Sequence, residues 1–242
     1  MIDRCKAFFS RPFWSDQRTL LALWLLLPII GGLVKINKCN NFLIFRYVFW
    51  HAWNGTSLYA PYPEEYHDVN HYGPFFSVVV APFAVLPQYL GVLLWVIALS
   101  MFLYVAIRKS QFTKYQQIFI LWFCAHELLT AIFMQQFNIA IAAVILLSYY
   151  CIEKKQDFWA AFFIMLGTFV KLYGIVGLAF FFFSRHKGRL VLSLVFWAVV
   201  MFAAPMMFHG PDYLIGQYQD WYETLSSKNA GNMISTTTHV SI

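Results

Sequence analysis

The chain has 242 residues, of which 60% are apolar, 20% are aromatic and only 12% are charged, and its formal net charge is +6. Soluble domains usually carry about 25% charged and about 45–50% apolar residues, so this composition excludes soluble enzyme folds, disordered tails and disulfide scaffolds. It predicts an all-α fold, a polytopic bundle of transmembrane helices.

The N-terminal segment is basic, and the first apolar run lacks a cleavage-site pattern. The sequence MIDRCKAFFSRPFWSDQR precedes this run, Thr19–Val34. We interpret the run as a retained signal anchor rather than as a removed signal peptide.

Six further apolar runs follow, and charged residues separate them. A straight crossing needs about 20 apolar residues, so several of the runs are too short to span a membrane alone. The runs are Phe75–Leu86, Tyr89–Ile107, Gln116–Met134, Ile139–Ile152, Phe158–Phe183 and Leu190–Phe208.

The Lys and Arg residues predict the side of the membrane on which each connector lies. Most of the 17 lie in the N-terminal tail and in connectors 108–114, 153–157 and 184–189, whereas 35–74 and 209–242 together hold six acids and four basic residues. The positive-inside rule puts the basic set, including the N-terminus, in the cytoplasm. We therefore expect a multi-pass protein of the plasma (inner) membrane, whose positive charge reflects topology and not binding of nucleic acid.

The predicted domain organisation follows from this topology. Residues 1–242 form a single membrane domain, with an extracytoplasmic loop at 35–74 and an extracytoplasmic helix and tail at 210–242. Within the loop, Phe42–Trp53 is an aromatic-rich helix with Arg46 and His51 as its polar positions. Because Trp and Tyr favour the headgroup level, we expect this helix to lie along the membrane interface.

Two of the apolar runs must return to the side from which they came. Phe75–Leu86 is short and contains Pro82, so we predict a re-entrant or interfacial segment. Phe158–Phe183 lies between two cytoplasmic connectors, which predicts two half-depth helices with an apex near Lys171, Tyr173 and Gly174. Irregular backbone at membrane depth must be buried in protein or line a wet cavity, so we expect a cavity that opens to the outside.

Several short motifs follow one another in a definite order. They are Asn41-Phe42, Gly55 with Tyr59, Tyr72-Gly73-Pro74, Leu86-Pro87, Leu94-Trp95, Gln136-Phe137-Asn138 and Lys171-Leu172-Tyr173. Their order and spacing, over about residues 40–225, resemble glycosyltransferase family 87, membrane enzymes of the GT-C type. The resemblance implies a polyprenyl-phosphate-linked sugar as donor, a lipid- or glycan-linked acceptor and transfer outside the cytoplasm, as in mannosyl and arabinofuranosyl transfer.

The chain departs from the family pattern in two ways. Asn40-Asn41 stands where the family often has Asp, the carboxylate usually given the role of base. The family also continues through further spans beyond Asp212–Leu225, so one alternative is an inactive, truncated member that acts as a membrane assembly partner. A second alternative is a transporter or flippase for lipid-linked sugars, because such proteins also use broken helices and midplane charges.

Sugar transfer from a phosphate donor needs a base for the acceptor hydroxyl. A partly desolvated loop carboxylate suits this role because burial raises its pKa toward the working pH. Asp68 is our first candidate and Glu65 and Glu64 follow, although all three also fit solvated loop acids. Asn41 can hydrogen-bond to substrate but cannot act as the base.

Lys171 is the clearest charge inside an apolar run. Such a charge costs about 2.5–3.5 kcal/mol to insert and usually faces a cavity or a partner, so Lys171 can bind the donor phosphate. A snorkelling lysine or a salt bridge with Glu127 is the alternative. The remaining candidates for substrate binding are His71, Tyr72, Gln136, Asn138 and Tyr173, although helix capping also explains Gln136 and Asn138.

The sequence predicts neither a metal site nor a cofactor. The four cysteines are far apart, which does not fit a zinc site or a disulfide framework. His126-Glu127 lies in the sequence HELLT, but Thr130 occupies the place of the second histidine in a metalloprotease helix. The expected partners are the lipid-linked donor, the acceptor and membrane lipids.

Overall fold

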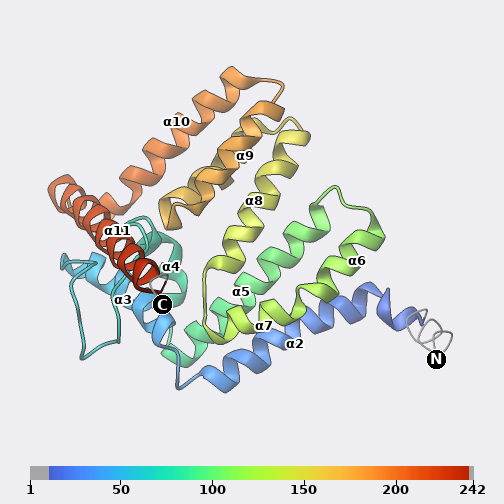
Figure 1. The fold of residues 1–242 in the computed structure, drawn as a ribbon, viewed down its shortest axis with the longest axis horizontal. Helices are drawn as coiled ribbons and strands as arrows, with labels where there is room; N and C mark the ends of the chain where they lie inside the picture. The colour runs from blue at the N-terminus through green and yellow to red at the C-terminus, as the bar shows by residue number, and fades with distance from the viewer. Residues whose placement is uncertain (1–10, 240–242) are drawn as a thin grey trace.

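The computed structural model describes residues 11–239, with side chains up to Lys228. Every regular element in this range is a helix (Figure 1), so the predicted all-α fold is confirmed for the described residues. Residues 1–10 of the predicted basic tail and residues 240–242 lie outside this range.

Within residues 11–239, three helices are long and apolar enough to cross a membrane. They are α2 (Gln17–Lys35), α5 (Gln88–Lys109) and the continuous stretch of α10 (Lys187–Ala203) with η3 (Ala204–Met207). A fourth candidate is a pair, α6 (Lys114–Phe123) and α7 (Ala125–Phe133), which is bent by 42°. These helices confirm the membrane character of the chain, but the run Gln116–Met134 is a broken helix and not a straight one.

The long helices pack side by side in a row. α2 contacts α5, α5 contacts α8 (Asn138–Glu153), α8 contacts α9 (Asp157–Lys171), and α9 contacts α10. In Figure 1 the connectors that follow α5 and α8 and that precede α10 lie along the upper-right edge of this row. These are the three basic connectors of the predicted cytoplasmic side, which therefore share one edge of the molecule.

The helices α3 (Asn40–Asn54) and α4 (Phe76–Ala84) lie along the opposite edge of the row, together with the long C-terminal α11 (Pro211–His239) (Figure 1). Among them, α4 (Phe76–Ala84) has nine residues, which gives a length of about 14 Å. This is less than half of a hydrocarbon core of about 30 Å. The segment Phe75–Leu86 is therefore too short to cross, although its re-entrant position stays a prediction.

The aromatic helix α3 (Asn40–Asn54) is buried more deeply than expected. Its core positions surround most of the helix and include Phe42, Phe45, Val48 and Phe49. Only a narrow stripe faces outward, so the predicted position along the interface applies to this stripe and not to the whole helix.

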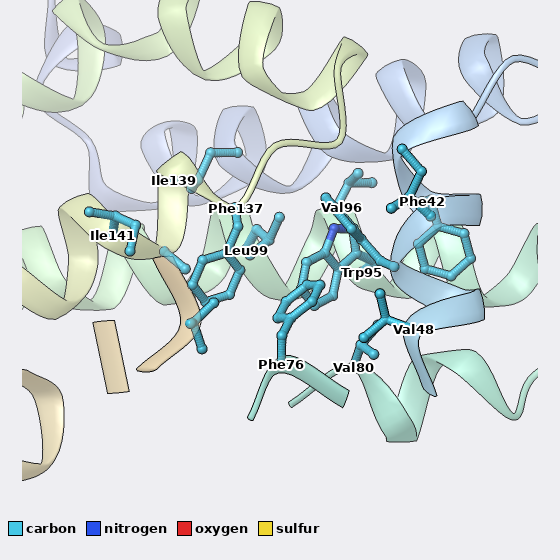
Figure 2. Close-up of a cluster of buried hydrophobic side chains, with 14 of the residues drawn as sticks. Phe42, Val48, Phe76, Val80, Trp95, Val96, Leu99, Phe137, Ile139 and Ile141 are labelled. Carbon is cyan, nitrogen blue, oxygen red and sulfur yellow. The ribbon is translucent and has the colours of Figure 1, made fainter. Parts of the chain in front are cut away.

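An aromatic cluster joins α3, α4 and α5 to the turn before α8. Figure 2 shows Phe76 and Phe137 beside Trp95, whose ring lies 5.9 Å from each of them. The indole Nε1 of Trp95 donates to the carbonyl of Gln135 at 3.1 Å. The Trp95 ring packs against two aromatic rings, and its N–H has a hydrogen-bond acceptor. The cluster therefore fixes the turn before α8 relative to α3, α4 and α5.

The chain reverses direction directly after Lys171. Leu172 has a positive φ of 54°, and the 3₁₀ helix η2 (Tyr173–Phe183) then packs back against α9. A 3₁₀ helix aligns residues three apart, so Gly174 and Gly177 share the face that is buried. The prediction of two short helices with an apex at residues 171–174 is confirmed, while their depth in the membrane stays a prediction.

The close approach of η2 to α9 can be tested at Gly174. A Cβ atom there would lie 2.3 Å from the carbonyl carbon of Gly167, so backbone must move. We expect Gly174→Ala to destabilise the protein by about 1–3 kcal/mol, measured as thermal unfolding in detergent. Gly216→Ala is the matched control, because no heavy atom lies within 4 Å of its new Cβ. Equal unfolding midpoints for the two variants would contradict this packing.

Candidate functional site

The site is centred on the ammonium group of Lys171, the last residue of α9. Its Nζ donates to Oδ1 of Asn138 at 2.6 Å. The same atom lies 5.3 Å from the ring centre of Tyr72 and 5.4 Å from that of Tyr173. Aromatic faces attract cations, so one hydrogen bond and two rings hold this charge in place.

Asn138 links Lys171 to a second amide. Its Nδ2 donates to Oε1 of Gln136 at 2.9 Å, while its Oδ1 accepts from the lysine. Asn138 is the first residue of α8, whose N-cap residue, Phe137, makes no side-chain cap. The explanation of Gln136 and Asn138 as helix caps is therefore wrong, because Asn138 accepts from Lys171 and Gln136 accepts from Asn138.

The alternative salt bridge between Lys171 and Glu127 does not form among the described residues. The Glu127 side chain is 78% exposed, and the imidazole Nδ1 of His126 lies 3.5 Å from its carboxylate. α7 packs on α2 and α8, and its buried residues are Leu128 and Ile132, so Glu127 lies on the exposed side of this helix.

Six of the residues singled out from the sequence line one cavity of about 230 Å³, which we call the inner cavity. They are Asn41, Asp68, His71, Tyr72, Gln136 and Lys171. Asn138 and Tyr173 contact the lysine beside it. Segments from five parts of the chain thus meet at this cavity: the start of α3, the loop before α4, the turn before α8, the end of α9 and, through Lys228, α11.

Asn40 and Asn41 hold the parts of this site together. The Asn40 side chain donates to the carbonyl of His67 at 2.7 Å and accepts from its N–H at 2.8 Å. Asn41 donates to the carbonyl of Met134 at 2.7 Å. The first asparagine therefore fixes the segment before Asp68, and the second ties α3 to the end of α7.

Asp68 lies at the rim of the inner cavity, and its side chain is exposed. Its φ is 80°, and its carboxylate accepts from the N–H of Val69 at 2.8 Å. Asp tolerates this left-handed conformation better than most residues because its short side chain can bond to nearby backbone. The second carboxylate oxygen has no partner among the described residues.

The two glutamates do not line the inner cavity. Glu64 is exposed, whereas a carboxylate oxygen of Glu65 lies 2.8 Å from Nε2 of His51, without the alignment of a hydrogen bond. The ring centre of His51 lies 3.9 Å from that of Tyr62, and the two rings are tilted by 30°. Glu65 thus belongs to a neighbouring histidine–tyrosine cluster.

The segment that carries His71 and Tyr72 is fixed directly on α9. The N–H of Gly73 donates to the carbonyl of Val170 at 3.0 Å, and a Cβ there would lie 2.2 Å from the carbonyl oxygen of Phe169. The indole of Trp221 in α11 donates to the carbonyl of His71 at 3.0 Å. Gly73 is therefore required for close approach, and it sets the position of the loop relative to Lys171.

His71 is half-buried, and its Nδ1 is buried without a hydrogen-bond partner in the described residues. Burial lowers the pKa of His71 below the ordinary value of 6.5. The charges of Lys228 and Lys171 lower it further, and Asp68 opposes them. The imidazole is therefore neutral at pH 7 and can offer a hydrogen bond without adding charge to the cavity.

A larger hollow of about 790 Å³ adjoins the inner cavity on the side of α11, and we call it the outer hollow. The two share Asp68, Val69, His71 and Lys228. The sequence interpretation missed its α11 wall, which contains Asp220, Glu223, Thr224, Ser227 and Lys228. The spacing of three and four residues along one helix face was the signal that could have revealed it.

An apolar groove of about 380 Å³ begins on the other side of the site. Leu103 of α5, Leu128 and Ala131 of α7 and Ile139 of α8 are among its walls. Gln136 lines both this groove and the inner cavity, and Asn138 lies at the same end. The groove therefore ends at the amides that hold Lys171.

Within the described range, His, Cys, Asp and Glu side chains do not gather in groups of three that could hold a metal ion.

A family model, glycosyltransferase family 87, matches residues 70–242. The chain belongs to glycosyltransferase family 87. No curated protein and no solved structure matches it.

Membership of family 87 implies a sugar donor and an acceptor as substrates. The matched range contains His71, Tyr72, Lys171 and the amides around Gln136. Asn41, Glu64, Glu65 and Asp68 precede it, so the role of these four residues depends on the geometry of this chain.

The lowered pKa of His71 predicts how stability depends on pH. Protonation favours the unfolded chain, so this contribution is present above about pH 6.5 and is lost as the pH falls, with a slope of at most about 1.36 kcal/mol per pH unit. We expect His71→Gln to flatten the fall in unfolding midpoint between pH 7.5 and pH 5. His67→Gln, on an exposed side chain nearby, controls for the loss of an imidazole. An unchanged pH profile in His71→Gln would contradict this prediction.

Proposed function

We propose that this family 87 protein transfers a hexosyl or pentosyl group, such as mannosyl, from a polyprenyl-phosphate donor to a lipid- or glycan-linked acceptor. The reaction takes place on the extracytoplasmic side of the plasma (inner) membrane, with the N-terminus in the cytoplasm. One observation carries the proposal: the fixed ammonium of Lys171 and the carboxylate of Asp68 line the same cavity.

The lysine suits the phosphate of the donor. An ammonium is a compact charge with three donors, of which Asn138 engages one. The remaining donors can bind phosphate oxygens, and Lys228 adds a second positive charge to the same cavity. Both charges stabilise the phosphate as it departs and gains negative charge.

The apolar groove supports a donor that carries an isoprenoid chain. It runs from the amides of Gln136 and Asn138 along α7 and α8, and its other walls are mostly apolar. A phosphate on Lys171 would leave the attached hydrocarbon chain beside the end of this groove that Gln136 and Asn138 line.

The proposed chemistry requires one proton transfer and one displacement. Asp68 takes the proton of the acceptor hydroxyl, and the acceptor oxygen forms a bond to the anomeric carbon of the sugar. The bond between that carbon and the phosphate oxygen breaks, and polyprenyl phosphate departs with the electron pair. The outer hollow, which meets the inner cavity at Asp68, has the position expected for the acceptor.

The arrangement of charges supports the proposed sidedness. The three basic connectors lie along the upper-right edge of the helix row in Figure 1, whereas the site is built where α9 ends and α3, α4 and α11 gather. With the basic edge in the cytoplasm, the site faces the outside.

The phosphate role can be tested with Lys171→Met. Loss of a charge-assisted contact is expected to weaken binding of polyprenyl phosphate by about 10- to 100-fold, measured with the detergent-purified protein by native mass spectrometry. Transfer of labelled mannose or arabinofuranose from polyprenyl phosphate into cell-membrane acceptors should be lost in parallel. Lys114→Met, at the opposite edge, is the control for charge. Unchanged affinity in Lys171→Met would exclude the phosphate role.

The role of Asp68 is tested with Asp68→Asn. Removal of a general base should slow transfer by about 10²- to 10⁴-fold while affinity for polyprenyl phosphate stays unchanged. Glu64→Gln, an exposed acid outside the cavity, should retain normal transfer. Equal rates for Asp68→Asn and wild type would exclude Asp68 as the base. Binding of donor without transfer by the wild-type chain would favour the assembly-partner alternative.

A further inference from the structure

A separate cavity lies on a different face of α3 from the inner cavity. It has a volume of about 480 Å³. Its walls are Leu43, Arg46, Tyr47, Trp50 and Asn54 of α3, with Gln88 at the start of α5. The α3 positions are spaced by three and four residues, so they share one helix face, whereas Ile44 and Phe45 line the inner cavity.

Arg46 is the charged residue of this cavity, and it has no hydrogen bond, ion pair or ring contact among the described residues. Arg108 at the opposite edge differs, because its guanidinium donates to the side chain of Gln117 at 2.9 Å. Neither glutamate of the loop before α4 lines this cavity: Glu65 contacts His51, and Glu64 is exposed. A half-buried guanidinium therefore lines an open cavity without an anion.

The ends of the candidate spans indicate the depth of this cavity. Gln88 is the first residue of α5, which is long and apolar enough to cross the membrane. A residue at the end of a span lies close to the lipid headgroups. Tyr47 and Trp50 agree with this depth, because tyrosine and tryptophan are enriched at membrane interfaces.

We propose that this cavity binds the phosphate group of an anionic membrane phospholipid. The planar guanidinium of Arg46 can donate two parallel hydrogen bonds to phosphate oxygens, a geometry that lysine cannot reproduce. The amide of Asn54 supplies further donors, and the Gln88 amide, which donates to Sγ of Cys39 at 3.4 Å, has a second N–H for the phosphate. Leu43, Tyr47 and Trp50 form apolar walls for the start of the acyl chains. This lipid site is separate from the proposed donor site, since the two cavities have no lining residue in common.

Binding of phosphatidylglycerol to Arg46→Gln tests the proposal. Delipidated protein in detergent is titrated with phosphatidylglycerol, and bound lipid is counted by native mass spectrometry, with phosphatidylcholine as the neutral lipid. We expect the wild type to prefer phosphatidylglycerol and Arg46→Gln to bind it about tenfold or more weakly. Arg46→Lys, which keeps the charge but not the planar group, should fall between the two.

Several controls keep the outcome specific. Lys38→Gln removes an exposed positive charge at the same end of the molecule and should bind phosphatidylglycerol normally. Arg46→Gln should retain the affinity for polyprenyl phosphate, and Lys171→Met should retain the affinity for phosphatidylglycerol. These two results distinguish a failure of the lipid-site proposal from a failure of the donor-site proposal. Normal phosphatidylglycerol binding by Arg46→Gln, or equal loss in Lys38→Gln, would overturn the proposal. If inorganic phosphate displaces bound phosphatidylglycerol from the wild type as strongly as added phosphatidylglycerol does, the assignment to a lipid is overturned.

Discussion

The positive charge at the end of α9 constrains much of the surrounding structure. A lysine that ends an apolar helix must keep its ammonium among polar atoms, because burying it without a partner costs several kcal/mol. The partner is Asn138, which begins α8, so α8 and α9 must have these ends at the same level. The reversal of the chain at Leu172 agrees with the same constraint. If α9 continued straight, the apolar residues after Lys171 would extend beyond the polar groups that surround its ammonium.

Different kinds of interaction hold the segments around the inner cavity in place. Aromatic packing around Trp95 fixes the turn that carries Gln136, and paired amide hydrogen bonds from Asn40 fix the segment before Asp68. Gly73 brings the next segment onto the backbone of α9. Because each support uses buried or fully paired groups, the cavity is preorganised before a substrate arrives, which is the condition for electrostatic stabilisation of a departing phosphate.

Much of this arrangement could be predicted from the sequence, because apolar runs, basic connectors and an intramembrane lysine have direct physical meaning. The reversal near Lys171 followed from such reasoning. The partner of Lys171 did not: Asn138 and Glu127 are both polar residues on neighbouring runs, and only the packing of α8 against α9 decides between them. The contact of Glu65 with His51, the burial of α3 and the α11 wall also depend on contacts between distant segments.

The shortness of α8 has a consequence for the bilayer itself. Its 16 residues give a length of about 24 Å, whereas the hydrocarbon layer is about 30 Å thick. Hydrophobic mismatch of this kind is relieved by local thinning of the bilayer, by snorkelling of flanking side chains or by association of helices, and here α5 and α9 pack against α8 on either side. α8 and the nine-residue α7 also form walls of the apolar groove, so these walls are shorter than the hydrocarbon layer is thick. The apolar surface of the groove therefore reaches the polar amides of Gln136 and Asn138 within the length of one short helix.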